Sequence, residues 1–390
     1  MSVPIRYIAI AALMLGALGA IGADYAPDFD PDYRPAPSSD EGGLWYKVDK
    51  LEADVRNSPH RIRDTELNDY LAEMVCALAG DFCSSIRVYL IDNPHFNASM
   101  APNGMMLVHT GLLLRVEDEA ELAAVLGHEI AHFLRSHQIK QWRNLRDSAA
   151  SAIWIDVGMV MFTGIYGLAQ MSTVGAALSY NRDQEREADL YGLQLLAASG
   201  YDPRAAPRLW TAIAEERALD TSKEARNPFF ATHPAAEDRQ QTLHQAALAY
   251  GDHHPGDAGG ELRTRLTPHY FAFMRGHLQL QEYEQTEYLL GKHQRLGYPE
   301  AQVAFFTGEL HRLRKAEGDG EKAIAAYSRA LQLPDPPADT YRELAYLKLK
   351  DNAAPEALQL FRRYLAVDPD ASDKAMIDYY IESLGAQIHE

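Results

Sequence analysis

The spacing of apolar residues along the chain predicts a mostly helical protein with a small sheet. Over long stretches apolar side chains recur every three or four positions, which is the period of a helix with one buried face. The predicted helices cover residues 44 to about 79, 118 to about 137 and 182 to 199. Two short segments, Ile86–Ile91 and Met105–Val108, have strand composition, and turn residues follow the first and precede the second. We therefore expect an α+β fold that is mainly α-helical.

The ends of two predicted helices are marked by capping residues. Asp118 and Glu121 form a cap-like pair at the start of one helix, and Arg135 lies near its end, where a positive charge favours the helix dipole. The other helix is stopped by Gly200 and Pro203. Both helices therefore have defined limits, and both carry the polar motifs described next.

The motif "HEIAH", which begins at His128, carries the most specific chemistry in the sequence. On a helix, His128 and His132 are four positions apart, so both imidazoles leave the same face and can share one zinc ion. Glu129 is offset along that face, where it can reach a zinc-bound water. Apolar neighbours such as Leu126 indicate a buried helix, in which two histidines and a glutamate would be costly without a ligand. A solvated face of a surface helix is the alternative.

A third protein ligand is expected in the stretch "NRDQEREADLYG". Glu185 and Asp189 lie four positions apart, and therefore on one face of the predicted helix. Glu185 can complete a site of two histidines and one glutamate, and Asp189 can orient a ligating imidazole. A surface helix with salt bridges to Arg182 and Arg186 is the alternative interpretation.

The paired motifs "HEIAH" and "EREAD" resemble those of the gluzincin metallopeptidases related to the CaaX-prenyl protease and the bacterial membrane protease HtpX. The resemblance implies a gluzincin-type metallopeptidase domain over residues 44–250. It implies one zinc ion per chain, held by His128, His132 and Glu185. Glu129 would then take a proton from the zinc-bound water and return it to the leaving amine.

The segment "NASMAPNGMMLVHTGLL", which starts at Asn97, is similar to the segment before the active-site helix in this family. There an edge strand pairs with an extended substrate. The resemblance implies that Asn97, Ala98, Ser99 and Met100 bind substrate through main-chain hydrogen bonds. An ordinary hairpin is the alternative.

His233 stands before a proline in "NPFFATHPAAEDR", and the pair is similar to an "HP" element at the matching place in periplasmic members of the family. It is a candidate catalytic residue, because the motifs do not identify the group that stabilises the oxyanion. It is equally a candidate fourth ligand, which would displace the water and hold the enzyme latent. A turn histidine with a solvated ring is the alternative.

The first residues have the layout of a secretory signal peptide. Arg6 precedes an apolar run, Ile8 to Ile21, that ends in small residues. We expect residues 1–23 to be removed on export. An uncleaved anchor is the alternative, although the run is short for a bilayer, which needs roughly 20 apolar residues. Residues 24–43 are rich in Pro, Asp and Ser, and we expect them to form a disordered leader.

The two cysteines, Cys76 and Cys83, lie close together in "CALAGDFC". On one continuous helix their Cα atoms would be about 10.5 Å apart, beyond the roughly 4.4 to 6.8 Å that a disulfide requires. Gly80 and Asp81 indicate that the helix ends between them, so the chain can fold back. We expect a disulfide, as suits an exported protein, and two buried thiols are the alternative.

Residues 154–180 form an apolar stretch between the two metal motifs, without charge from Val157 onward. The length would suit a membrane span, but a single crossing would separate the histidines from Glu185. We therefore expect a pair of short helices that contact a membrane peripherally or touch an assembly partner. A re-entrant hairpin and a helical hairpin buried in the core are the alternatives.

The C-terminal part, residues 263–390, predicts tetratricopeptide repeats after a Gly-rich and His-rich linker at 251–262. Small and aromatic positions recur 34 residues apart. They are Ala323, Tyr327 and Ala330 in one repeat and Ala357, Phe361 and Tyr364 in the next. Gly308, in the earlier repeat, is out of register, which indicates a lengthened turn. Stacked helical hairpins of this α-solenoid would leave a concave surface for peptides or proteins, and a plain helical bundle is the alternative.

The formal net charge of -18 argues against one class of partner, nucleic acid. A surface of that sign repels phosphate backbones, so we expect no nucleic-acid partner. A zinc peptidase fused to such repeats resembles the BepA-type proteins of the Gram-negative periplasm. The resemblance implies a periplasmic protease and chaperone that acts on unfolded envelope proteins and contacts the components that assemble outer-membrane β-barrels. The alternatives are a chaperone or adaptor with a latent zinc site, and an integral membrane protease.

Overall fold

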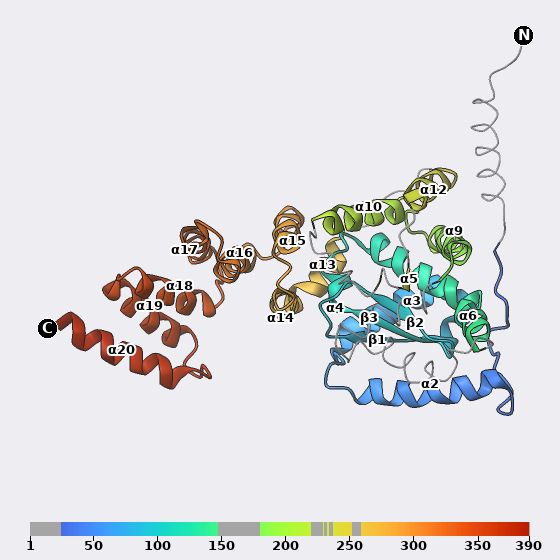
Figure 1. Ribbon diagram of the computed structural model, residues 1–390, viewed down its shortest axis with the longest axis horizontal. Coiled ribbons are helices and arrows are strands. Elements are labelled where there is room, and N and C mark those ends of the chain that lie inside the picture. The colour runs from blue at the N-terminus through green and yellow to red at the C-terminus, as the bar shows by residue number, and fades with distance from the viewer. Residues whose placement is uncertain are drawn as a thin grey trace, which may run out of the picture. The chain divides into compact units, whose positions relative to one another are not determined.

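The computed structural model describes residues 25–146, 180–219, 229, 232–233, 237–251 and 259–389 (Figure 1). The chain divides into two compact units, Met1–Pro268 and His269–Glu390. This division lies a few residues after the predicted end of the linker, because the helix α13 (Gly260–Leu266) packs within the first unit against α3 (Thr65–Ala79). The predicted signal peptide, residues 1–23, lies outside the described residues.

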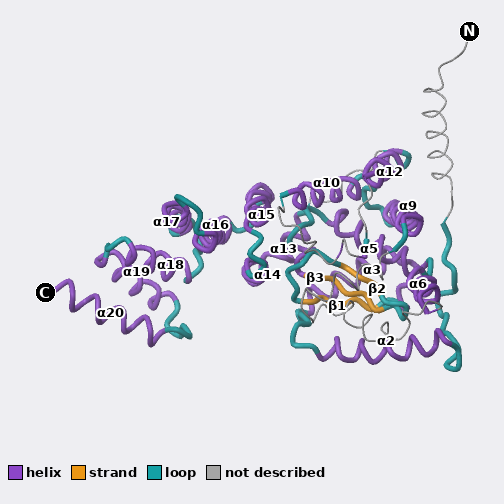
Figure 2. The backbone as a smooth tube through the Cα atoms, viewed as in Figure 1, coloured by secondary structure: helices purple, strands orange, loops and turns teal. Residues whose placement is uncertain are grey.

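A three-stranded sheet lies in the first unit, and its strands are the orange segments of Figure 2. The strand β1 (Arg87–Ile91) runs parallel to β3 (Met105–His109), and β2 (Ala98–Met100) runs antiparallel to β3. The order is β1-β3-β2, so β3 is central and β2 lies at one edge. This short mixed sheet among many helices confirms the expected α+β class with a helical majority.

Both faces of the sheet are covered by helices, because successive strand residues point to opposite sides and both sets are apolar. The helix α2 (Asp40–Asn57) covers one face (Figure 1). That core consists of Val48, Leu51, Val55, Tyr89, Ile91, Ala101, Met105 and Leu107. The helices α3 and α5 (Glu119–Leu134) cover the other face. The helix that carries "HEIAH" therefore lies in the interior of the unit.

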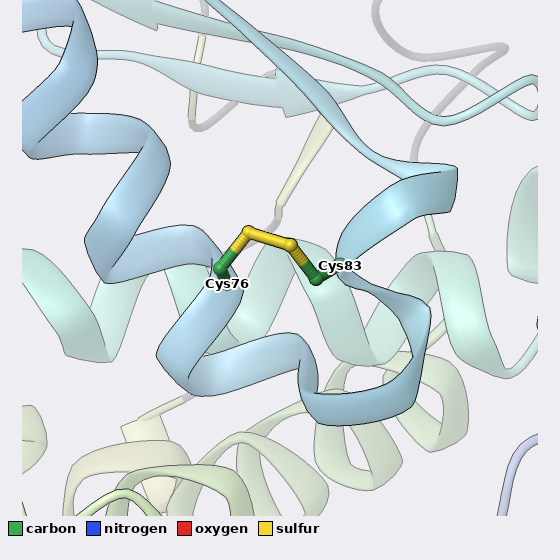
Figure 3. The surroundings of a disulfide bond; sticks show 2 residues. All are labelled: Cys76 and Cys83. Atoms are coloured by element: carbon green, nitrogen blue, oxygen red, sulfur yellow. A yellow bond between two sulfur atoms is a disulfide. The ribbon is translucent and has the colours of Figure 1, made fainter.

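The helical stretch predicted before the sheet consists of two helices. The helix α2 ends at Asn57, and Pro59 follows its C-cap, because a residue before proline avoids the helical conformation. The helix α3 ends at Ala79. Its C-cap, Gly80, has a φ of +56°, and a 3-10 turn, Gly80–Ser85, reverses the chain. This reversal places Cys76 and Cys83 with their Cα atoms 4.5 Å apart and their sulfur atoms at bonding distance (Figure 3).

The prediction of a disordered leader is wrong for residues 25–43, because residues 25–39 pack on the rest of the first unit and residues 40–43 begin α2. Phe29 sets its ring edge-on against Phe82 and Phe133. The Asp28 carboxylate pairs with Arg135 at 2.7 Å and with Lys140 at 2.8 Å. Average composition does not predict this order, because it comes from a few side chains that fit a surface already built by the rest of the domain.

The helix predicted from Asp118 to about His137 is shorter than expected. Asp118 accepts the Glu121 N–H at 2.8 Å, as the sequence predicts, but the helix ends at Leu134. Ser136 then takes a φ of +48°, and a new helix, α6 (His137–Arg146), begins. Ser136 carries a Cβ atom, which makes a positive φ less favourable than it is for glycine. This left-handed turn is therefore a locally costly conformation that the surrounding structure imposes.

Three further helices of the first unit pack around α5, two of them directly on it. The helix α9 (Arg182–Ala198) begins with a capping box between Asn181 and Gln184. It is followed by α10 (Ala205–Ala218) and α12 (Glu237–Leu248). The apolar stretch 154–180 is described only at Tyr180. Within the described ranges, no helix is both long and apolar enough to cross a bilayer.

The second unit consists of helices in the part of it that the structure describes. They are α14 (Tyr270–Leu278), α15 (Tyr283–Leu296), α16 (Glu300–Arg314), α17 (Asp319–Ala330), α18 (Asp339–Lys350), α19 (Ala354–Val367) and α20 (Lys374–His389). The helix α16 packs on α17, and α18 packs on α19. The six residues that define the predicted repeat are all buried. The out-of-register Gly308 lies against the Tyr327 ring, where a Cβ atom would come within 2.5 Å of ring carbons.

Candidate metal centre

The helices α5 and α9 approach each other closely at Gly127 on α5 and Gly192 on α9. A Cβ atom at Gly192 would lie 3.1 Å from the backbone nitrogen of His128, so any side chain there would push the helices apart. Asp189 and Glu185 lie one and two helical turns before Gly192 on α9. The close crossing therefore brings both acids beside the histidines of α5, although the two motifs are far apart in the chain.

Four buried side chains bring their donor atoms together at this crossing. They are His128, His132, Glu185 and His233, and one donor atom from each lies within 4.8 Å of the others. The Nε2 atoms of His128 and His132 are 3.0 Å apart, and Glu185 Oε1 is 3.4 Å from His132 Nε2. Three imidazoles and one carboxylate are a donor set that zinc prefers in proteins. The predicted ligands thus converge, and His233 joins them.

A network of acids and a buried arginine holds the far sides of these ligands. Asp189 Oδ1 lies 3.0 Å from Nδ1 of His128, which leaves the Nε2 lone pair of that imidazole facing the cluster. Arg239, from α12, donates to both oxygens of Asp189 at 2.6 and 2.7 Å and lies 2.8 Å from Glu185 Oε2. Its guanidinium also sits over the Trp210 ring. One arginine therefore positions two carboxylates.

Glu129 lies beside the donor cluster but is not one of its four members. Its side chain is buried, with 1% of its surface exposed, and its Oε1 has no hydrogen-bond partner among the described residues. That oxygen lies 3.4 Å from His233 Nε2. A buried carboxylate oxygen without a partner is costly unless a ligand or water occupies the space it faces. The residues present therefore fit a zinc ion with a bound water.

Burial and neighbouring charges set the protonation of the site. Burial lowers the pKa of His132 well below its usual value, which keeps that imidazole neutral. Burial alone would raise the pKa of Glu185, but His233, His132 and Arg239 hold it well below its ordinary range. Burial raises the pKa of Glu129 against the opposing effect of His233. A metal ligand is thus kept ionised, while Glu129 is set apart as a group able to take up a proton.

Two aromatic rings stack on imidazoles of the donor cluster. The Tyr180 ring stacks on His132 with 3.9 Å between ring centroids. The Phe229 ring stacks on His233 at 4.4 Å. Neither residue was predicted to be part of the site, since an aromatic side chain carries no ligand signature of its own in the sequence. Arg239 was missed for a related reason, because Glu237 and Asp238 beside it look like ordinary local partners.

The residues predicted to bind substrate lie in and before β2. Ala98–Met100 form the strand, and Asn97 precedes it, with its carbonyl accepting the His109 N–H at 3.1 Å. The helix α5 packs against β2. The buried side-chain oxygens of Asn97 and Ser99 have no hydrogen-bond partner among the described residues. Polar groups without partners thus lie along the strand nearest to the metal-binding helix.

The fold and the donor cluster fit a metallopeptidase, and the comparisons with known proteins agree with this class. Residues 61–247 match the model of Peptidase family M48. This segment contains the sheet, the helices α5 and α9, and all four residues of the donor cluster. The match therefore supports the prediction of a metallopeptidase domain over this part of the chain.

Among curated proteins, the chain is similar to proteases of bacteria and of mitochondria. It is 28% identical over 207 residues to the putative beta-barrel assembly-enhancing protease of Vibrio cholerae, covering 50% of this chain and 42% of that protein. It is 28% identical over 246 residues to the beta-barrel assembly-enhancing protease of Escherichia coli, covering 59% of this chain and 49% of that protein. It is 31% identical over 165 residues to the mitochondrial metalloendopeptidase OMA1 of Arabidopsis thaliana, covering 42% of this chain and 32% of that protein. The aligned part thus spans less than half the length of each of these relatives.

Proposed function

We propose that this protein is an exported zinc endopeptidase that cleaves extended segments of unfolded or stalled envelope proteins. The observation that carries the proposal is the convergence of His128, His132 and Glu185 in a buried cluster with Glu129 beside it. The similarity to beta-barrel assembly-enhancing proteases supports the envelope as the place of action.

Each residue of the site would have a separate role in peptide hydrolysis. Bound zinc would supply a Lewis acid and a water whose pKa falls toward about 7. His128, His132 and Glu185 would hold the ion, and Asp189 would keep His128 in the required tautomer. Glu129 would take the proton from the attacking water and pass it to the leaving amine.

A direct test of the function uses casein as an unfolded substrate. The purified protein should cleave casein, lose that activity on treatment with a chelator, and regain it when zinc is restored. The chelator removes the ion that polarises the scissile carbonyl, so the loss should be nearly complete. Cleavage that persists in the fully zinc-free protein would contradict a zinc mechanism.

We propose further that β2 binds the substrate as an added strand. Asn97 and Ala101 bond to β3, so by the alternation of an antiparallel ladder Ala98 and Met100 direct their main-chain groups outward. The Met100 carbonyl is already taken by the Gln138 side-chain amide, which donates to it at 3.2 Å. The Ala98 main chain and the Met100 N–H, although both residues are buried, are therefore the groups that would pair with an extended peptide.

This strand pairing can be tested without altering the protein. A series of substrate peptides, each N-methylated at one amide outside the scissile bond, should show losses in kcat/KM that alternate along the peptide. Each affected position should lose about 2- to 10-fold, the size of one hydrogen bond. Losses of similar size at every position would argue against pairing with β2.

His233 is proposed as a resting ligand that keeps the site latent. Its Nδ1 lies 2.9 Å from Glu185 Oε1 and 3.3 Å from His128 Nε2, inside the donor cluster.

The place of His233 among the ligands favours a second function as well, that of a chaperone or adaptor whose peptidase is normally inactive. If a Glu129→Gln protein restored envelope integrity fully to cells lacking the native protein, the chaperone function would be the principal one. Failure of that protein would assign the function to proteolysis.

Replacing His233 with Ala should raise the rate of casein cleavage several-fold while zinc remains bound. The reason is that removing a fourth ligand opens a coordination position for water. Cleavage and zinc content should be measured on the same preparation, with a His244→Ala protein as control, because His244 lies outside the cluster on α12. An unchanged or lower rate with full zinc content would contradict latency and would point to a role for His233 in catalysis.

The helical second unit is proposed to be a tetratricopeptide-repeat domain that docks the enzyme on clients or on barrel-assembly components. The paired helices α16–α17 and α18–α19, with buried Ala323, Tyr327, Ala357 and Phe361 at the repeat positions, support this proposal. Export to the periplasm would also suit oxidation of Cys76 and Cys83. A protein lacking residues 269–390 should then keep casein cleavage but lose co-purification with assembly components, and retained co-purification would contradict docking by this unit.

A further inference from the structure

His132 makes a second contact, on the side of its ring that faces away from the donor cluster. Its Nδ1 lies 2.8 Å from Nδ1 of His137, the first residue of α6. The other ring nitrogen of His137, Nε2, lies 3.1 Å from Glu187 Oε2. Both imidazoles are buried, with 0% and 1% of their surface exposed. Neither His137 nor Glu187 has a part in the mechanism given above.

The direction of these hydrogen bonds follows from Glu187, the last group in the series, because an ionised carboxylate cannot donate a hydrogen bond. Glu187 accepts only, so Nε2 of His137 must carry the hydrogen that it shares with the carboxylate. Nδ1 of the same neutral ring is then an acceptor, and Nδ1 of His132 must donate to it. Nε2 of His132 is left with its lone pair, and that atom faces His128 Nε2 and Glu185 Oε1.

We propose that His137 and Glu187 are positioning residues that hold His132 in the tautomer and orientation needed to bind zinc. The inference rests on the proposed zinc site and adds a second set of residues to it. His128 is oriented directly by the Asp189 carboxylate, whereas His132 is oriented by a carboxylate that acts through a second imidazole. Both ligands thus receive the acceptor that metal-bound histidines usually have, by two different routes.

The backbone between the two histidines supports this role. His132 and His137 are five positions apart, so on a continuous helix their side chains would point about 140° apart. The end of α5 at Leu134 and the left-handed φ of +48° at Ser136 turn the chain so that the two rings meet. A conformation that is costly for serine, and that places a buried imidazole on a metal ligand, is the kind of local strain that accompanies functional sites.

The outer end of the relay is anchored to the leader. Arg135 Nε donates to Glu187 Oε1 at 2.6 Å, which fixes the carboxylate from the side opposite to His137. The same guanidinium donates to the Ala26 carbonyl at 2.8 Å and pairs with Asp28 at 2.7 Å. The leader thus holds the arginine, the arginine holds Glu187, and Glu187 holds the imidazole that orients His132.

The test is the zinc affinity of the full chain, measured by competition with a chromogenic chelator. The His137→Leu protein should bind zinc about 10- to 100-fold more weakly than the native protein, the usual loss for such supporting residues. The His137→Asn protein should recover most of the affinity, because its amide oxygen can take the place of Nδ1 as the acceptor. The cobalt-loaded proteins should show the same order in their visible absorption, with Leu perturbed and Asn close to native.

A second variant guards against a loss of fold at the buried His137. Glu187 is partly exposed, and Glu187→Ala should weaken zinc binding in the same direction without removing a buried ring. The matched control is Asp183→Ala, which removes the same charge from an exposed position on the same helix and should bind zinc as the native protein does.

Three outcomes distinguish a failure of the proposed zinc site from a failure of the relay through His137 and Glu187. If the native protein takes up no zinc, the proposed function itself fails. If the native protein binds zinc and both His137→Leu and Glu187→Ala bind it equally well, the relay is overturned while the zinc site stands. If the His137→Asn protein binds zinc as weakly as the His137→Leu protein, the contribution of His137 is packing rather than an acceptor for His132, and the relay is again overturned.

Discussion

Replacing Glu129 with Gln is expected to lower kcat/KM for casein cleavage by about 10²- to 10⁴-fold, the usual contribution of a general base. The amide has nearly the same shape as the carboxylate but cannot take a proton from water. Glu129 is not among the four clustered donors, so zinc content should stay at the native level. The measurement is cleavage rate and zinc stoichiometry on one preparation.

The control for this substitution is Glu73→Gln, which removes a carboxylate from an exposed position on α3. It should leave both cleavage and zinc content unchanged. Retention of native cleavage by the Glu129→Gln protein would remove Glu129 from the mechanism. It would also require another base, for which His233, whose Nε2 lies 3.4 Å from Glu129 Oε1, would be a candidate.

Replacing Arg239 with Ala is expected to reduce the free energy of unfolding of the first unit by about 3–5 kcal/mol, the loss seen when one member of a buried ion pair is removed. Arg239 pairs with Asp189 and Glu185, and all three side chains are less than a tenth exposed. Without the guanidinium, two carboxylates that are kept ionised would lie buried without their counter-charge. Zinc binding should weaken as well, because Asp189 orients His128.

Tryptophan fluorescence during chemical denaturation can measure this loss selectively. All four tryptophans, Trp45, Trp142, Trp154 and Trp210, belong to the first unit, so their signal does not report on the helices that follow it. The control is Arg143→Ala. Arg143 is 53% exposed and pairs with Glu41, and an exposed pair contributes only about 0–1 kcal/mol. Equal destabilisation by the two substitutions would show that the Arg239 network does not stabilise the unit.

The parts of the site that could be predicted from sequence are those that depend on local spacing. Two histidines four apart, and two acids four apart, share a helix face wherever the helix packs. The cap at Asp118 also acts within its own turn. These relations need only the helix itself, so each pair could be named from spacing. The joining of Glu185 to His128 and His132 in one set rested on the resemblance of the two motifs to those of a known family.

The parts that could not be predicted depend on contacts between distant segments. Arg239 reaches two acids about fifty residues earlier in the chain. Phe29 is ordered by rings of η1 (Gly80–Ser85) and α5, so a segment with the composition of a disordered leader is packed instead. His137 looked like the last residue of a continuous helix, and only the turn at Ser136 reveals its contact with His132.

The sequence by itself determined which side chains could hold a metal ion, because its motifs place particular side chains at the period of a helix. Tertiary structure decided how those side chains are held. The crossing at Gly127 and Gly192, the arginine shared by Asp189 and Glu185, and the second imidazole behind His132 all arise from packing between segments. The reason is physical: helix periodicity is a property of neighbours in the chain, whereas the orientation of a buried ligand depends on whichever groups the fold places around it.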